Sequence, residues 1–111
     1  MGKFFTFADR IVRIQFFEEE PVNLMLVISD ETDKKIVSSG KMFNEADKSG
    51  EIDDRREKYR AALEHLIGEE KTAAILDRAD ELDSFAIFSV YRYILAEYSA
   101  QKVKNLSASG R

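Results

Sequence analysis

The chain has 111 residues, of which 44% are hydrophobic and 34% charged, and it contains no cysteine. This length fits one domain with a core of its own, and the missing cysteine excludes disulfides, a thiol nucleophile and cysteine-bound zinc. The formal net charge is −4, and acids and bases are mixed along the chain, whereas a nucleic-acid-binding protein usually presents a concentrated basic face.

No segment has the pattern of a signal peptide or a membrane span. The N-terminal segment is interrupted by Asp9, Arg10 and Arg13, so it lacks a continuous apolar region. The longest apolar-rich run, Phe85 to Ala96, contains Arg92 and is about a dozen residues, too short for a bilayer. We therefore expect a cytoplasmic protein without membrane contact.

A small antiparallel sheet is predicted in residues 1–30. Residues 11–17 are rich in β-branched and aromatic types, and Pro21 ends this strand because it cannot donate to a ladder. Residues 22–29, VNLMLVIS, form the next strand, with positions 23, 25 and 27 on one face and 24, 26 and 28 on the other. A tight turn at residues 8–10 would add a short strand before it, giving two or three strands.

Residues 31–50 are predicted to hold a short helix, about Thr32 to Ala46, and then a connector. The preceding polar residues 29–33 offer several N-cap candidates. Ser38, Ser39 and Gly40 weaken the helix because serine and glycine have low helix propensity. Partial disorder of this segment is one expectation.

Residues 51–104 are predicted to be helical. A helix beginning at Ile52 or Asp53 has a regular apolar stripe, and Gly68 ends it as a glycine after a helix commonly does. A short helix follows at about residues 69–78. A last helix is expected at about residues 84–104, capped by Asp80 or Asp83, and residues 105–111 are expected to be a frayed tail.

These elements predict a single α+β domain over residues 1–111. A sheet of two or three strands cannot stand alone and must pack against helices. The expected architecture is therefore a small N-terminal antiparallel sheet followed by three or four helices.

The stretch FNEADKSGEIDDRRE, residues 43–57, imitates a calcium-binding loop. With Gly50 at position 6 of an EF-hand loop, Glu45 falls at position 1 and Asp47 at position 3. Position 12 is then Arg56, where the loop needs a bidentate glutamate. We expect no metal site here, but a solvated connector leading into the next helix.

Catalytic chemistry has little support in the residues. His65 is the only histidine, and no Gly-x-Ser-x-Gly elbow or glycine-rich phosphate loop occurs. Acid pairs such as Asp53 and Asp54 are adjacent, so on a helix they point about 100° apart. We expect a non-enzymatic protein without a cofactor, in which His65 lies on a helix surface or is partly buried.

The last helix is apolar on more than one face, which is typical of a helix central to a core or shared with a partner. In the first interpretation, the sheet covers one side of it and the other helices cover the second. In the alternative, part of it binds a partner, since tyrosine, phenylalanine and arginine favour interfaces. The residues assigned to partner binding are Phe85, Phe88, Tyr91, Arg92, Leu95 and Tyr98.

The order of elements resembles that of the small tail assembly chaperones of phages and prophages of Gram-positive bacteria. The resemblance lies in an N-terminal hairpin, an acidic middle, a helix ending in LEHLIGEEKTAAIL (residues 63–76) and a last helix at residues 83–98. It spans most of the chain in organisation, but its only local motif is the short segment around Gly68 and Glu69.

The resemblance implies a non-catalytic protein that binds the helical tape-measure protein in the host cytoplasm and keeps it soluble before tail assembly. It also implies a homo-oligomer. Alternatives are a structural or connector component of a phage particle, and a small cytosolic regulator or adaptor.

Overall fold

The computed structural model describes residues 3–109, with side chains for residues 3–106. A two-stranded antiparallel sheet is followed by four helices, which confirms the predicted small α+β fold. The strands are β1, Ile11–Phe16, and β2, Val22–Val27. The helices are α1, Asp30–Asp47, α2, Ile52–Ile67, α3, Glu69–Leu76, and α4, Ser84–Ser109.

The hairpin has the register expected from its alternating pattern. Ile14 lies opposite Leu24, and both side chains are buried, whereas Met25 points away from the core. Phe17 and Glu20 adopt positive φ in the turn between the strands. The additional strand expected before residues 8–10 does not form, because residues 3–9 run as an extended arm that pairs with no strand in the described chain.

Helix α1 is longer than predicted and is not weakened at Ser38, Ser39 and Gly40. It begins after Ser29, whose Oγ accepts a hydrogen bond from the Thr32 amide at 3.2 Å. A β-carbon on Gly40 would lie 3.4 Å from the Tyr91 hydroxyl of α4. Gly40 therefore leaves room for the Tyr91 side chain, whose hydroxyl donates to the Ile36 carbonyl at 3.3 Å, and α1 continues through these residues despite their low helix propensity.

The buried Ser39 hydroxyl supplies the first testable prediction. Ser39 is fully buried, and its hydroxyl has no hydrogen-bond partner among the described residues. Ser39→Ala is expected to raise the free energy of unfolding by about 1 kcal/mol, because it removes an unsatisfied buried polar group and improves helix propensity. Urea denaturation followed by circular dichroism measures the change.

Ser38→Ala is the matched control, because Ser38 is only half-buried. Its free energy of unfolding should rise by no more than about 0.5 kcal/mol, the difference in helix propensity between serine and alanine. Equal or lower stability of Ser39→Ala relative to Ser38→Ala would contradict the assignment of an unsatisfied hydroxyl.

The later helices begin where predicted, and α2 also ends at Gly68 as predicted, whereas α3 ends earlier and α4 later than expected. Gly68, at φ 90°, separates α2 from α3, a conformation that side chains disfavour. Asp83 caps α4, since its Oδ1 accepts from the Ala86 amide at 2.9 Å. The predicted frayed tail is wrong for residues 105–109, which continue α4, and residues 110 and 111 lie outside the described chain. Hydrogen bonds made by Gln101 and Asn105 support this last part of the helix.

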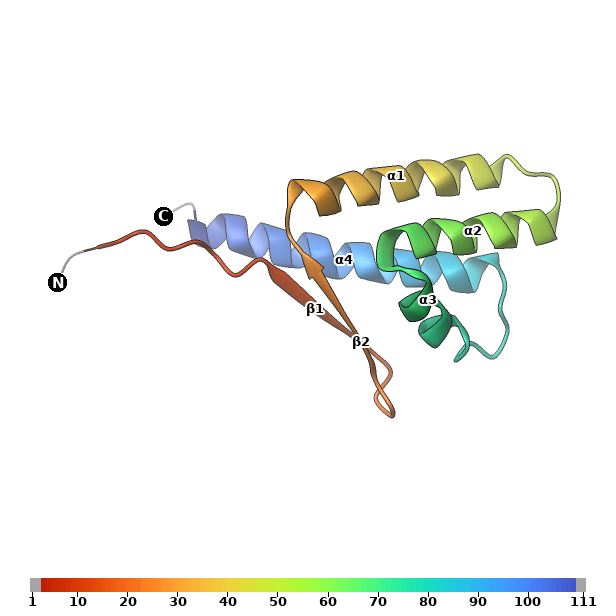
Figure 1. Ribbon diagram of the computed structural model, residues 1–111, viewed down its shortest axis with the longest axis horizontal. Coiled ribbons are helices and arrows are strands. Elements are labelled where there is room, and N and C mark those ends of the chain that lie inside the picture. The colour runs from red at the N-terminus through yellow and green to blue at the C-terminus, as the bar shows by residue number, and fades with distance from the viewer. Residues whose placement is uncertain (1–2, 110–111) are drawn as a thin grey trace.

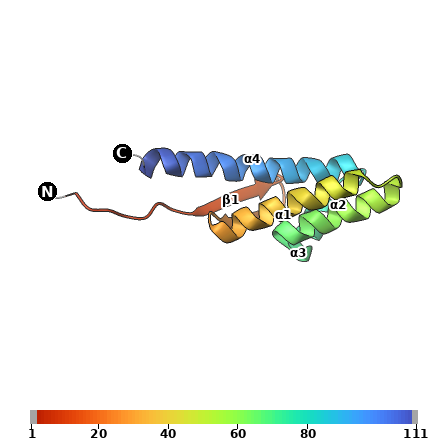
Figure 2. The ribbon, with the colours of Figure 1, turned by 90° about the horizontal axis from the view of Figure 1, so that it is seen from above.

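The molecule is elongated and flat. Helices α1 and α2 lie antiparallel on one side, α4 runs along the other, and the hairpin crosses α4 with α3 beside it (Figures 1 and 2). The radius of gyration is 16.4 Å, whereas a compact domain of this length has about 13 Å. The excess comes largely from the C-terminal part of α4 and the N-terminal arm, which extend together beyond the other helices.

Candidate protein-binding site

The six α4 residues predicted to bind a partner do not share one exposed surface. Tyr91 and Tyr98 are buried within the chain, at 6% and 3% exposure. Phe88 and Leu95 are half-buried against the core, while Phe85 and Arg92 are exposed. The assignment of these residues to partner binding stays a prediction, and in the described chain only Phe85 and Arg92 of the six are exposed.

An aromatic cluster explains the burial of Tyr91 and Phe88. Phe43 of α1 lies at its centre, with ring centroids 4.4 Å from Tyr91, 4.8 Å from Tyr59 and 5.4 Å from Phe88. Such contacts between rings add to the free energy of burying their apolar area. The aromatic residues of α4 thus join α1 and α2 into one core rather than forming a surface of their own.

Tyr98 belongs to a polar network between α4 and the first turn of α1. Its hydroxyl donates to Asp33 Oδ1 at 2.7 Å, and Lys102 Nζ contacts Asp33 Oδ2 at 2.8 Å. The hydrogen bond from Lys102, and then that from Tyr98, lower the pKa of Asp33. Burial, and then the bond to Asp33, raise the pKa of Tyr98 to about 12. The network holds α4 to the start of α1.

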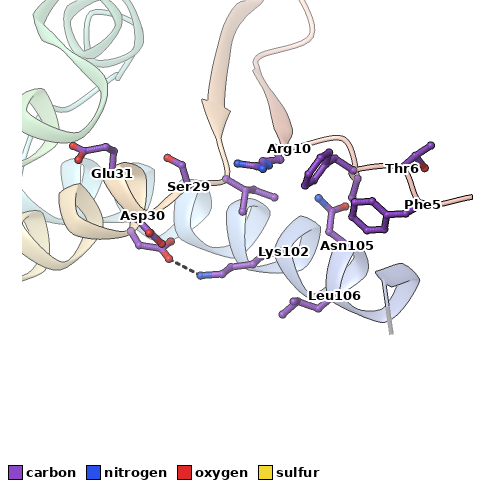
Figure 3. A pocket seen from close by; sticks show the side chains of 13 residues that line it. Phe5, Thr6, Arg10, Ser29, Asp30, Glu31, Lys102, Asn105 and Leu106 are labelled. Atoms are coloured by element: carbon purple, nitrogen blue, oxygen red, sulfur yellow. Dashed lines mark hydrogen bonds and ion pairs between the residues drawn. The ribbon is translucent and has the colours of Figure 1, made fainter. Parts of the chain in front are cut away.

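A groove, here called the end groove, lies beside this network. The N-terminal arm, the start of α1 and the last turns of α4 line it, and its volume is ≈680 Å³ (Figure 3). Phe5, Phe7 and Leu106 supply much of its apolar surface, while Asp30 and Lys102 are among its polar lining residues. An apolar floor with charged edges suits an amphipathic segment of another protein.

Three large, exposed apolar side chains line the end groove. Phe5 and Phe7 of the arm are 76% and 77% exposed, and Leu106 of α4 is 65% exposed. Phe4 and Val103, 84% and 62% exposed, lie on the same two segments but do not line the groove. Large apolar side chains gathered on one surface mark an interaction site more often than single ones do. The groove is formed by segments from near both ends of the chain. Nothing in the sequence indicates that these two segments lie side by side.

Sequence reasoning missed this site for two reasons. The three phenylalanines were assigned to a strand, and Leu106 was assigned to a frayed tail. The signal available in the sequence was the density of aromatic residues in residues 4–7, which exceeds what one short edge strand needs.

The calcium-like loop uses its acids in local contacts. Asp47 accepts a hydrogen bond from the Tyr59 hydroxyl, Asp54 accepts one from Ser49 at 2.7 Å, and Asp53 pairs with Arg56. Among residues 3–109, no group of three or more histidine, cysteine, aspartate or glutamate side chains is placed to hold a metal ion. In the same range, no helix is both long and apolar enough to cross a membrane.

Comparison with known proteins returns no family model, no curated protein and no solved structure that matches this chain.

Proposed function

We propose that this chain is a non-catalytic holding chaperone of the tail assembly type, which binds amphipathic helices of a tape-measure protein in the host cytoplasm. The observation that carries the proposal is the end groove, where exposed apolar residues of the arm and of α4 face a common space. A long protein with unpaired apolar helices needs such a surface until it assembles.

Two further features support the proposal. Helix α4 and the arm project together beyond α1 and α2, so a target helix can approach the last turns of α4 without meeting the bodies of those two helices (Figure 1). The net charge of −4 favours solubility of a complex whose target is apolar. The residues of α4 proposed to contact the target are Val103 and Leu106, and Phe85 and Arg92 offer a second exposed area.

The test is co-expression with the large helix-rich protein encoded beside this chain. A pull-down followed by light scattering should give a soluble complex, whereas the partner alone should precipitate. Leu106→Asp is expected to weaken this complex at least about tenfold, since it places a charge in the apolar contact. Leu106 is 65% exposed in the free chain, so folding should be unchanged.

Ala100→Asp is the matched control, because Ala100 is also exposed on α4 but does not line the end groove. It should bind as the wild type does. Equal binding by Leu106→Asp and the wild type would reject the end groove as the target site. Recovery of the chain in finished particles would favour a structural or connector component instead.

A further inference from the structure

The outer edge of β2 is open. The Ile28 amide donates to the Arg10 carbonyl at 2.7 Å, and these residues continue the register of the hairpin. In an antiparallel pair of strands, the backbone amide and carbonyl of one residue bond to the partner strand, and those of the next residue point away from it. Leu24 and Leu26 therefore bond to β1, while the amides and carbonyls of Asn23, Met25 and Val27 point outward. Within residues 3–109 these outward groups have no hydrogen-bond partner.

The outer edge of β1 is protected, unlike that of β2. The Ile11 amide donates to Asp9 Oδ1 at 3.0 Å, and the Gln15 carbonyl accepts from the Tyr93 hydroxyl of α4 at 3.1 Å. Proteins commonly protect open edges with charged side chains or proline. Strand β2, VNLMLV, contains neither, so its edge is left available for pairing.

A second groove, here called the edge groove, runs beside β2. Residues 24–27 line it on one side, and Thr32, Lys35 and residues 64–68 line it on the other, with a volume of ≈490 Å³. Four consecutive residues of β2 line the groove, and their side chains lie alternately on the two faces of the sheet. The part of β2 that faces the groove is therefore its backbone edge. A groove between a strand edge and helices is the arrangement that receives an added strand.

The N-terminal arm has the properties of that missing strand. Residues 3–8 are extended, and in the described chain they make no hydrogen bonds. Phe5 and Phe7 lie two residues apart, so both would face the same side of a strand, where exposed Met25 and Val27 are available as neighbours. Pairing would satisfy the open backbone groups and cover these apolar side chains together.

Within its own chain the arm runs away from this edge and does not pair with it (Figure 1). It leaves the hairpin at Arg10 on β1, and the outer edge of β2 lies about two strand spacings away, roughly 10 Å. Crossing that distance and turning would use about three or more residues of the arm. We therefore propose that the arm of a second copy adds to β2 as a third strand, and that two copies exchange arms in a closed dimer.

The expected contact area fits a weak, reversible dimer. Each aromatic ring buries about 150–250 Å², so two arms with Phe5 and Phe7, together with Met25 and Val27, remove on the order of 1,000 Å² from water, which is the size of weak or transient interfaces. Exchange moves Phe5 and Phe7 out of the end groove and leaves its α4 wall, including Leu106, open. The inference does not depend on the proposed function.

Met25→Pro tests the inference by sedimentation velocity of the full chain, without any target protein, over a wide range of concentration. The Met25 amide does not bond to β1, so proline removes only the outward donor, which an edge strand tolerates. The wild type should be a dimer that dissociates on dilution. In Met25→Pro, dimer dissociation should occur at a concentration at least about tenfold higher.

Arg13→Pro is the matched control, because the Arg13 amide points outward from β1 on the protected side of the hairpin. It should dimerise as the wild type does. The double variant Phe5→Ser and Phe7→Ser should weaken the dimer as Met25→Pro does, and it cannot disturb the core because both rings are exposed.

Hydrogen exchange provides a local measurement on the same samples. The amides of Asn23, Met25 and Val27 should exchange at least about tenfold more slowly at high than at low protein concentration, whereas the Arg13 amide should not change. A wild-type monomer at all concentrations would overturn the inference. So would a dimer that Met25→Pro leaves intact, or one in which these three amides exchange equally fast at both concentrations.

Discussion

Phe43→Ala is expected to lower the free energy of unfolding by about 3–5 kcal/mol, the range measured when a buried aromatic residue is truncated. Phe43 is 3% exposed and contacts aromatic rings from both α2 and α4. Its removal leaves a cavity where α1, α2 and α4 meet, and the surrounding rings cannot close it without losing their own contacts. The total free energy of unfolding of a folded domain is about 5–15 kcal/mol, so the variant should be close to unfolding at 37 °C.

Urea denaturation followed by far-UV circular dichroism measures this loss. Phe43→Leu keeps most of the apolar volume, so its free energy of unfolding should fall clearly less than that of Phe43→Ala. Phe85→Ala is the control, since Phe85 is 85% exposed on α4 and should change stability by less than about 0.5 kcal/mol. If Phe43→Ala were no less stable than Phe85→Ala, Phe43 would not be the centre of the core.

Alkaline unfolding is the second large effect, and Tyr98 is expected to contribute to it. The folded pKa of Tyr98 is about 12, above the usual value of 10.0, because burial and the hydrogen bond to Asp33 favour the protonated hydroxyl. The folded state therefore holds this proton more tightly than the unfolded state does. The stabilisation is fully present below about pH 10 and is lost as the pH rises from about 10 to about 12.

The size of the effect follows from the two pKa values. A difference of one unit corresponds to about 1.4 kcal/mol, so the rise from 10.0 to about 12 corresponds to on the order of 3 kcal/mol that disappears over this pH range. Ionised Tyr98 would place a second negative charge beside Asp33, at an O–O distance of 2.7 Å. Tyrosinate absorbance and far-UV circular dichroism should therefore change together as α4 separates from the start of α1.

Tyr98→Phe separates this contribution from those of other tyrosines. At neutral pH it should lose about 1.5–3 kcal/mol, the value of a hydrogen bond to a charged group. The stability difference between the wild type and Tyr98→Phe should shrink as the pH rises from about 10 to about 12, because the wild type loses over this range a contribution that the variant already lacks. An alkaline transition should remain in the variant, because burial also raises the pKa of Tyr59 and Tyr91. Tyr93→Phe is the control, since Tyr93 is 41% exposed. A stability difference that stays constant over this pH range would contradict the role of Tyr98.

Local patterns in the sequence were sufficient for most of the secondary structure. The alternation in residues 11–16 and 22–27 predicted both strands and the buried faces on which Ile14 and Leu24 lie. Gly68 and Asp83 marked helix boundaries correctly, because caps act within a few residues of the chain. These predictions succeeded since each depends on neighbours in the sequence.

Packing between distant segments decided the candidate site. The sequence showed that α4 is apolar on several sides but not which side α1 and α2 cover. The structure buries Tyr91 and Tyr98 against α1, through contacts with Phe43 and Asp33. The segment 38–40 illustrates the same limit, since its low local propensity predicted a weak helix, whereas α1 is continuous there and Gly40 lies against the Tyr91 hydroxyl of α4.

The sequence by itself determined the α+β class, the order of the elements, the alternating faces of the strands and the short segments, 29–33 and 80–83, in which the caps of α1 and α4 lie. These depend on side-chain periodicity and on hydrogen bonds between near neighbours. Only the tertiary structure decided that the arm forms no strand within its own chain, that α4 continues to Ser109 and that both surround the end groove. Those outcomes depend on contacts between residues that are far apart in the sequence, such as Asp9 and Asn105. The free energy of such contacts is not encoded in any local sequence pattern.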